Sequence, residues 1–225
     1  GSGNTVYDSS GNGNDGTVYG ASWVDGKFGK ALSFDGVNDY VEVPDSASLD
    51  ITGPVAVEAW VYIKRSDTKQ YFVSKTANYV LWIQDNNEIR FADTYVNYVD
   101  TYPISEFNQW IHVVGVFSGK VGDAVSLDNA NIYINGEARG THTDGIWSAT
   151  ANQGYTVRIG DWYGKYYLSG TIDEVRIYNR ALSAEEISDL YNNYGYTTTN
   201  YPGKVLVRKY TEPEPTVDVG FEQSK

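Results

Sequence analysis

The sequence predicts an all-β domain, an antiparallel sandwich of two sheets with one short helix near its C-terminal end. Three observations predict it. Short runs of β-branched and aromatic residues recur along the chain and are separated by Gly, Asn and Asp. Aromatic residues make up 15% of the chain, and they favour pleated sheet surfaces. Helical segments do not alternate with the strands as a parallel sheet would require, so we expect the sheets to be antiparallel.

The first half of the chain predicts seven strands, near residues 17–24, 31–34, 40–43, 55–64, 71–75, 79–84 and 88–92. The segment 55–63 shows the clearest pattern. Its odd positions are all small or branched apolar residues, whereas its even positions are mixed. This is typical of a strand with one face in the core and one face partly exposed.

The second half predicts six more strands, near residues 97–102, 110–118, 131–134, 137–139, 156–160 and 170–178. Asn135 and Gly136 give the strongest hairpin signal, because both residue types tolerate positive φ. One helix follows. Ser183 and Glu186 have the spacing of a capping box, and Ile187, Leu190 and Tyr194 recur three or four residues apart. We expect this helix to pack one face on the sandwich.

These elements predict a single domain over residues 1–195. Residues 196–225 differ in composition, with a linker at 197–203, one added strand at 204–210, and an extended acidic segment that begins at Glu212. Such a composition is typical of a domain boundary, so we expect the chain to be part of a longer polypeptide.

The charge and composition exclude several classes of function. The chain carries 17 Lys and Arg against 29 Asp and Glu, a formal net charge of −12, which disfavours a nucleic-acid partner. It has no cysteine, so thiolate chemistry and disulfides are excluded. No run of about 18 apolar residues occurs, and we predict no membrane insertion. Small cations are natural partners for such an acidic chain.

Four segments of the chain carry a resemblance to a known family. They are residues 8–16 followed by 29–44, residues 57–61, residues 110–117 with 132–136, and residues 170–182. In this order they resemble the laminin-G-like jelly-roll family of the concanavalin A-like lectin/glucanase superfamily. The resemblance implies two antiparallel sheets packed as a jelly roll. It also implies a secreted or cell-surface protein with a role in adhesion or carbohydrate recognition.

The same resemblance implies a structural calcium ion between the N-terminal loop and the last core strand. Calcium takes about six to eight oxygen ligands from carboxylates, amides and carbonyls. The matching residues are Asp35, Asn38 and Asp173, with Gly36, Asp8 and Asn14 to complete the shell. These residue types also build Asx turns without a metal, and the sequence leaves both interpretations open.

The sequence predicts a binding module rather than an enzyme. Glucanases with this fold carry a Glu-x-Asp-x-Glu strand, and retaining glycosidases need two closely spaced carboxyl groups. Glu58 stands alone in its predicted strand, and Asp173 and Glu174 are expected on opposite faces of theirs. No Gly-x-Ser-x-Gly elbow accompanies His112 or His142, and we expect His112 to be a packed strand residue.

A ligand surface is predicted from aromatic residues in loops, because such rings stack on sugar rings. The candidates are Trp162, Tyr163, Tyr166, Trp147, Trp82 and Tyr95. Trp82 equally fits a core position. The leading hypothesis is a carbohydrate-binding module for a polysaccharide or glycan. The alternative is a structural or adhesive domain of a multi-domain surface protein, which meets a protein partner or itself through the strand at 204–210.

Overall fold

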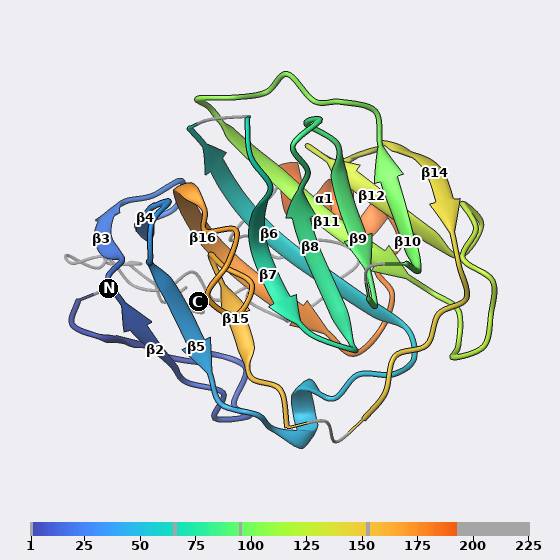
Figure 1. Ribbon diagram of the computed structural model, residues 1–225, viewed down its shortest axis with the longest axis horizontal. Helices are drawn as coiled ribbons and strands as arrows, with labels where there is room; N and C mark the ends of the chain where they lie inside the picture. The colour runs from blue at the N-terminus through green and yellow to red at the C-terminus, as the bar shows by residue number, and fades with distance from the viewer. Residues whose placement is uncertain (1, 65–66, 95, 152–153, 193–225) are drawn as a thin grey trace, which may run out of the picture.

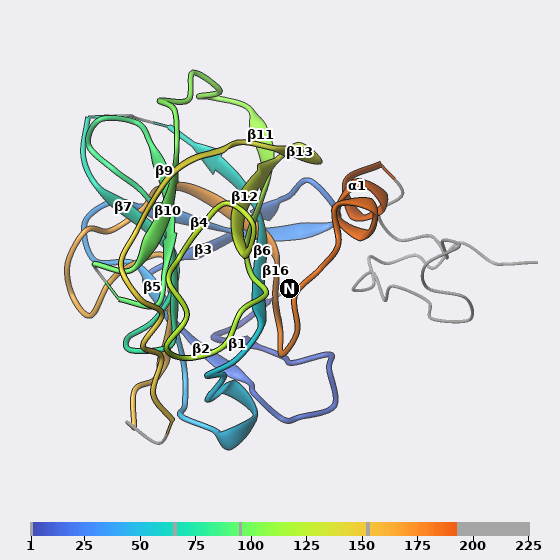
Figure 2. The same cartoon turned by 90° about the vertical axis from the view of Figure 1, so that its right-hand side faces the viewer.

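Two antiparallel sheets pack face to face and enclose the core (Figure 1, Figure 2). The computed structural model describes residues 2–64, 67–94, 96–151 and 154–192. The predicted jelly-roll sandwich is confirmed. The nine-stranded sheet contains, in spatial order, β1 (Thr5–Val6), β2 (Gly16–Tyr19), β5 (Tyr40–Val43), β15 (Val157–Ile159), β7 (Gln70–Lys75), β8 (Tyr79–Ile83), β9 (Ile89–Ala92), β10 (Tyr98–Thr101) and β14 (Gly140–Asp144).

The seven-stranded sheet joins segments from both ends of the domain. It contains, in spatial order, β13 (Glu137–Ala138), β12 (Ala130–Ile134), β11 (Trp110–Phe117), β6 (Val55–Ile63), β16 (Ser169–Tyr178), β4 (Lys30–Asp35) and β3 (Ser22–Asp25). β16 inserts between β6 and β4, while β15 inserts between β5 and β7 in the other sheet. The late strands therefore complete both layers.

Strand β8 shows how the nine-stranded sheet divides its side chains between two faces. Tyr79, Leu81 and Ile83 belong to the core between the sheets. Val80 and Trp82 belong to a separate cluster on the outer face. Successive side chains of a strand point to opposite faces, so this one strand supplies both the core and an outer aromatic surface.

Strand β6 is almost fully buried on both faces, which corrects the expectation of one partly exposed face. Helix α1 (Ala184–Asn192) covers the outer face of the seven-stranded sheet (Figure 2). Ile187 and Leu190 of the helix pack in one cluster with Ala56. Trp60 stacks on Tyr191 with 5.7 Å between ring centroids. The mixed side chains of β6 therefore face a helix rather than water.

The predicted capping box of α1 is confirmed. The Ser183 hydroxyl accepts a hydrogen bond from the Glu186 amide at 3.1 Å, and the Glu186 carboxylate accepts one from the Ser183 amide at 2.9 Å. Within the described ranges, no helix has both the length and the apolar character needed to cross a membrane.

The strand predicted at 17–24 is two strands, β2 and β3, which lie in different sheets. Gly20 separates them with φ of +76°, a backbone conformation that favours glycine. A Cβ at this position would lie 2.0 Å from an Asp39 carboxylate oxygen. The chain turns at Gly20 and passes from one layer to the other.

Two edge strands were not predicted. β1 has only two residues, and β14, which contains His142, has side chains that are mostly exposed or half-buried and carry no apolar pattern. The helix position Tyr194 and the strand predicted at 204–210 lie outside the described residues.

Candidate functional site

An aromatic cluster covers part of the outer face of the nine-stranded sheet. Tyr71 of β7 and Trp82 of β8 stack with 5.2 Å between centroids and 4° between planes. Trp162 lies 6.0 Å from Tyr71 at 22°, and Tyr166 lies 5.7 Å from Tyr71, also at 22°. The near-parallel, offset rings form one apolar platform, an arrangement that aromatic side chains prefer.

The loop between β15 and β16 brings Trp162 to this platform. Arg158 of β15 forms two hydrogen bonds of 2.8 Å with the Asp161 carboxylate, which also accepts one from the Gly164 amide at 2.7 Å. The backbone of Trp162 and Lys165 exchanges hydrogen bonds of 2.9 and 3.0 Å. The loop is therefore a tight, fixed turn, and its indole is half-buried against the sheet.

A hollow with about 370 Å³ of open space lies beside the platform. Tyr71, Trp82 and Trp162 form its aromatic wall, and two aliphatic side chains add to the apolar lining. The remaining lining residues are polar: Thr76 from the turn between β7 and β8, and Asp93 and Thr94 directly after β9. A mainly apolar hollow with a few convergent polar groups is typical of small-molecule sites.

Hydrogen bonds hold the polar side chains of Thr76 and Asp93, which line the hollow. The Trp162 Nε1–H donates to the Thr76 hydroxyl at 3.3 Å. Asp93 is fully buried, and its Oδ2 accepts hydrogen bonds from the Ser148 hydroxyl at 3.0 Å and the Asn97 amide at 3.1 Å. Together with a third from the Ser148 amide, these hydrogen bonds fix the orientation of the Asp93 carboxylate.

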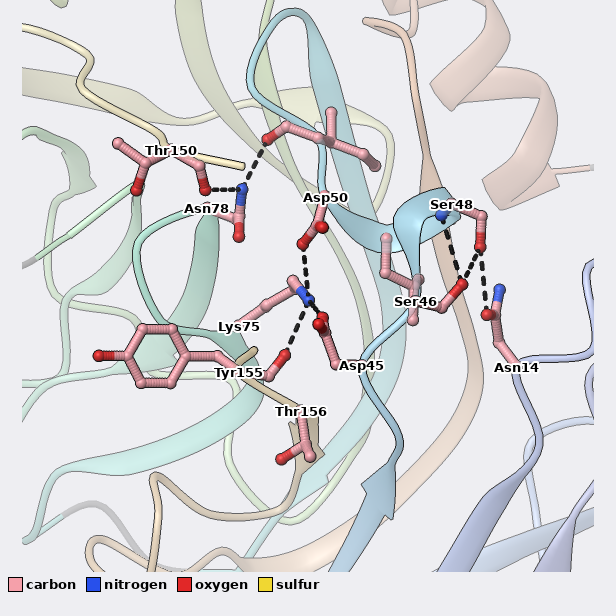
Figure 3. Close-up of polar contacts among 12 residues, drawn as sticks. Asn14, Asp45, Ser46, Ser48, Asp50, Lys75, Asn78, Thr150, Tyr155 and Thr156 are labelled. Carbon is pink, nitrogen blue, oxygen red and sulfur yellow. Dashed lines mark hydrogen bonds and ion pairs between the residues drawn. The ribbon is translucent and has the colours of Figure 1, made fainter. Parts of the chain in front are cut away.

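Lys75, the residue directly before Thr76, holds the start of the β7–β8 turn, and Figure 3 shows its contacts with Asp45, Asp50 and Tyr155. The Lys75 ammonium lies 2.5 Å from the Asp45 carboxylate, 3.1 Å from that of Asp50 and 2.7 Å from the Tyr155 carbonyl oxygen. The Lys75 side chain has no exposed surface. One buried cation therefore ties the β5–β6 and β14–β15 connections to the end of β7.

Asn78, on the other side of the same turn, adds two hydrogen bonds. Its amide nitrogen donates to the carbonyl oxygens of Ile51 at 3.2 Å and Thr150 at 3.1 Å (Figure 3). Lys75 and Asn78 together anchor the β7–β8 turn, and with it one rim of the hollow.

The structure brings some of the predicted ligand residues together. Trp162 and Trp82 both line the hollow, but Trp162 is half-buried whereas Trp82 is 1% exposed and packs in a buried cluster. Tyr166 is 43% exposed and stacks on Trp162 at 6.2 Å, so it extends the same platform. Tyr163 does not line the hollow, and its hydroxyl donates to the Thr156 carbonyl oxygen at 2.6 Å. Burial raises the pKa of the Tyr163 hydroxyl.

Trp147 does not lie at this surface, and the expectation of a loop aromatic facing a ligand is corrected. Its side chain has no exposed area and stacks on Phe117 with 4.0 Å between centroids, inside the sandwich core. Backbone hydrogen bonds with Gly122 and Asp123 fold this segment back over the sheets. Tyr95 lies outside the described residues.

The predicted calcium ligands fall in three separate places. Asp35, Gly36 and Asn38 belong to the turn between β4 and β5. The Asp35 carboxylate accepts hydrogen bonds from the amides of Val37 at 2.8 Å and Asn38 at 3.4 Å, which is the geometry of an Asx turn. Gly36 has φ of +82°.

Asp173 lies at the other end of β4. Ser169 pairs with Asp35, and Asp173 follows four residues later, about 13 Å away at the usual rise of a strand. The Asp173 carboxylate accepts a hydrogen bond from the Phe28 amide at 2.8 Å. Burial, with the nearby charge of Glu174, raises the pKa of Asp173 to about 6.

Asp8 and Asn14 lie in the loop that joins β1 to β2, at the opposite end of β5 from Asp35. The Asp8 carboxylate accepts hydrogen bonds from the amides of Ser10 at 2.8 Å and Asn14 at 3.0 Å. Partial burial acts to raise the pKa of Asp8, but these hydrogen bonds outweigh it and the pKa is lowered.

The six predicted residues therefore do not fit a single calcium ion. Across the described ranges, no three or more acidic or histidine side chains gather as a metal site. The structural calcium ion remains a prediction, without a site among these six residues.

A second ionisable cluster is buried beneath α1. Glu58 Oε1 lies 3.0 Å from His112 Nε2, and the Tyr178 hydroxyl donates to Glu58 Oε2 at 2.7 Å. Burial acts to raise the pKa of Glu58, but His112 and Arg176 outweigh it and the pKa is lowered. Neither Glu58 nor His112 has exposed surface, so this cluster stabilises the packing, as expected for His112.

Tyr71, Lys75 and Asp93 are site residues that were not predicted. All six residues of β7 are buried. Buried and exposed positions therefore do not alternate along this strand, and nothing indicates that Tyr71 lies on the outer face of the sheet. Asp93 and Thr94 follow an apolar strand directly, and this position at a strand end is the signal that could have found them. Nothing in the local sequence indicates the carboxylates that surround Lys75.

The sequence of residues 35–188 matches the family model described as the concanavalin A-like lectin/glucanases superfamily. This match covers more than half of the chain. The chain belongs to the concanavalin A-like lectin/glucanase superfamily. No curated protein matches this lectin-like chain in sequence.

Solved structures share the lectin-like fold at low sequence identity. Domain 4 of AbnA, a GH43 extracellular arabinanase from Geobacillus stearothermophilus in complex with arabinotriose, is 22% identical with a TM-score of 0.63, over 82% of this chain and 92% of that one. A Trypanosoma rangeli sialidase in complex with the inhibitor DANA is 18% identical with a TM-score of 0.58, over 79% of this chain and 29% of that one. A heptameric SAP-like pentraxin from Limulus polyphemus is 19% identical with a TM-score of 0.54, over 73% and 82%.

Proposed function

We propose that this lectin-like domain is a carbohydrate-binding module and that the hollow beside Trp162 is its ligand site. The observation that carries the proposal is the platform of Tyr71, Trp82 and Trp162 next to the polar groups of Thr76 and Asp93. A sugar ring has an apolar C–H face and a rim of hydroxyl groups. The hollow offers a surface for each, an apolar wall and a few fixed hydrogen-bonding groups.

The fold supports the same class of ligand. The arabinanase domain that shares this fold is described in complex with arabinotriose, a carbohydrate. Because the identity to that domain is 22%, the likeness supports the class and not a particular sugar.

The proposed module binds without catalysing. Glycoside hydrolysis generally uses two carboxyl groups on either side of the scissile bond. Among the residues that line the hollow, Asp93 alone carries a carboxylate. Glu58 lies on the other sheet, beneath α1. We also propose a secreted or cell-surface location, which is where modules of this kind meet polysaccharides.

The alternative function, a structural or adhesive domain, depends on protein contacts. β14 is an edge strand of the nine-stranded sheet, and such edges accept added strands. The segment predicted to add one, residues 204–210, lies outside the described residues, so this alternative remains a prediction.

Titration of the domain with soluble neutral oligosaccharides tests the proposal. We expect Trp162→Ala to weaken binding by at least about tenfold, because stacked aromatic contacts contribute about a kcal/mol each beyond their buried area. Tyr102→Ala is the matched control, since Tyr102 is 74% exposed at the far end of β10. Equal affinity of wild type and Trp162→Ala for every sugar that binds would refute this site.

A further inference from the structure

Asp93 is the one charged group in the wall of the hollow, and only half of its carboxylate is used by the protein. Its Oδ2 is held by the Ser148 hydroxyl and amide and by the Asn97 side chain. Its Oδ1 is buried and has no hydrogen-bond partner among the described residues. A buried acceptor left without a donor is costly, by about 1–3 kcal/mol and more for a charged group.

The position of Asp93 explains what could supply that donor. The residue lines the hollow together with Thr94 and with the aromatic side chains of Tyr71, Trp82 and Trp162. A ligand seated on the indole of Trp162 would bring its polar rim toward Asp93. A hydroxyl group donating to an ionised carboxylate forms a charge-assisted hydrogen bond, which is about twice as strong as a neutral one.

No cation balances this carboxylate within the hollow. The residues that line it include no Lys, Arg or His. Two cations lie at the platform but outside the lining of the hollow. The Arg90 guanidinium lies 5.7 Å from the Trp82 ring centroid and is engaged by two hydrogen bonds of 2.6 Å to Asp100, and the Lys69 ammonium lies 5.4 Å from the Tyr166 ring centroid. An anionic sugar would therefore meet Asp93 without a compensating positive charge, in a protein whose formal net charge is −12.

We infer that the ligand is a neutral sugar that donates a hydroxyl hydrogen to Asp93, and that Asp93 excludes sialic and uronic acids. This inference rests on the proposed function and names the class of sugar that the site selects.

The test is a titration of the wild-type domain with matched pairs of oligosaccharides that end either in a neutral hexose or pentose or in the corresponding uronic or sialic acid. We expect the neutral member of a pair to bind at least about tenfold more tightly. Asp93→Asn, which keeps the shape of the side chain, should weaken neutral binding by about tenfold or more and narrow the difference within the pair. Asp128→Asn makes the same change of net charge in an exposed turn of the other sheet and should alter neither value.

The outcomes separate the two claims. Binding that depends on Trp162 but is equal for neutral and acidic sugars would overturn the inference and leave the proposed function standing. Unchanged neutral binding by a folded Asp93→Asn variant would do the same. The absence of any Trp162-dependent sugar binding would overturn both. The wild-type comparison needs no variant, so it decides charge selectivity even if Asp93→Asn fails to fold.

Discussion

Lys75 and Asp50 form an ion pair with 3.1 Å between Nζ and Oδ1, in which the lysine side chain has no exposed surface and the aspartate has 6%. Asp45 adds a second carboxylate at 2.5 Å. The loops behind the hollow are therefore joined by a cation that belongs to the chain itself. Buried charges persist only when they are paired in this way.

Replacing that cation should destabilise the domain strongly. We expect Lys75→Met to lower the free energy of unfolding by about 3–5 kcal/mol, because it leaves the carboxylates of Asp45 and Asp50 without their partner. Chemical denaturation measures the effect. Lys30→Met is the control: the Lys30–Asp25 pair has the similar length of 2.6 Å but is exposed, so its loss should have a much smaller effect on the free energy of unfolding. Equal effects of the two substitutions would contradict the proposed role of Lys75.

Calcium titration tests the structural ion that the sequence predicts. Asp35 and Asp173 lie at opposite ends of β4, so one ion does not join them. If the predicted ion binds at other residues, the midpoint of thermal unfolding should rise with calcium concentration and fall in EDTA. The same midpoint in excess calcium and in EDTA would contradict the predicted ion.

The raised pKa of Asp173 predicts a pH-dependent stability. The Asp173 carboxyl has a pKa of about 6 in the folded protein against an ordinary value of 3.8, so the folded protein binds the carboxyl proton more tightly than the unfolded chain does. The free energy of unfolding therefore falls as pH rises from about 4 to 6 and stays lowered above pH 6. Asp173→Asn should remove this loss and stabilise the domain at pH 7 by up to about 3 kcal/mol. The difference should vanish near pH 3.5.

Urea denaturation at the two pH values measures this prediction, with the exposed Asp25→Asn as control. A variant that is less stable than wild type at pH 7 in calcium-containing buffer would contradict it, and would instead favour Asp173 as a metal ligand.

The sequence located most strands because their apolar positions follow the pleat, as in β6 and β8. It did not show the break at Gly20, which depends on the close approach of Asp39 from a neighbouring segment. The sequence also predicted a partly exposed outer face for β6. This prediction is wrong because Tyr191, far away in the chain, covers Trp60 on that face. Contacts between distant segments decided both cases.

The sequence predicted some residues of the candidate site and missed others. Trp162 stands out as an aromatic residue in a loop, and it lines the hollow. Trp147 has the same local character, but long-range backbone hydrogen bonds carry it into the core. Tyr71 and Asp93 join the site through the pairing of β7, β8 and β9, which no local pattern specifies.

The different environments of Trp147 and Trp162 predict opposite effects of substitution. Trp147→Ala should lower the free energy of unfolding by about 3–5 kcal/mol, as expected for a large buried aromatic residue, and should leave the affinity of the folded fraction for sugar unchanged. Denaturation curves and ligand titration on the same preparation measure both quantities. Loss of sugar affinity at unchanged stability would place Trp147 in the ligand site and contradict the packing described above.

The central claim, that sugar binds on the platform of Tyr71, Trp82 and Trp162, is tested most directly by the indole N–H signals of the six tryptophans in a ¹H–¹⁵N NMR titration. A sugar that binds should shift the signals of Trp162 and Trp82 with the same saturation curve. The signals of Trp23 and Trp110, which lie on the seven-stranded sheet, should stay in place. Saturable binding that moves Trp23 or Trp110 and leaves Trp162 and Trp82 unchanged would contradict the account.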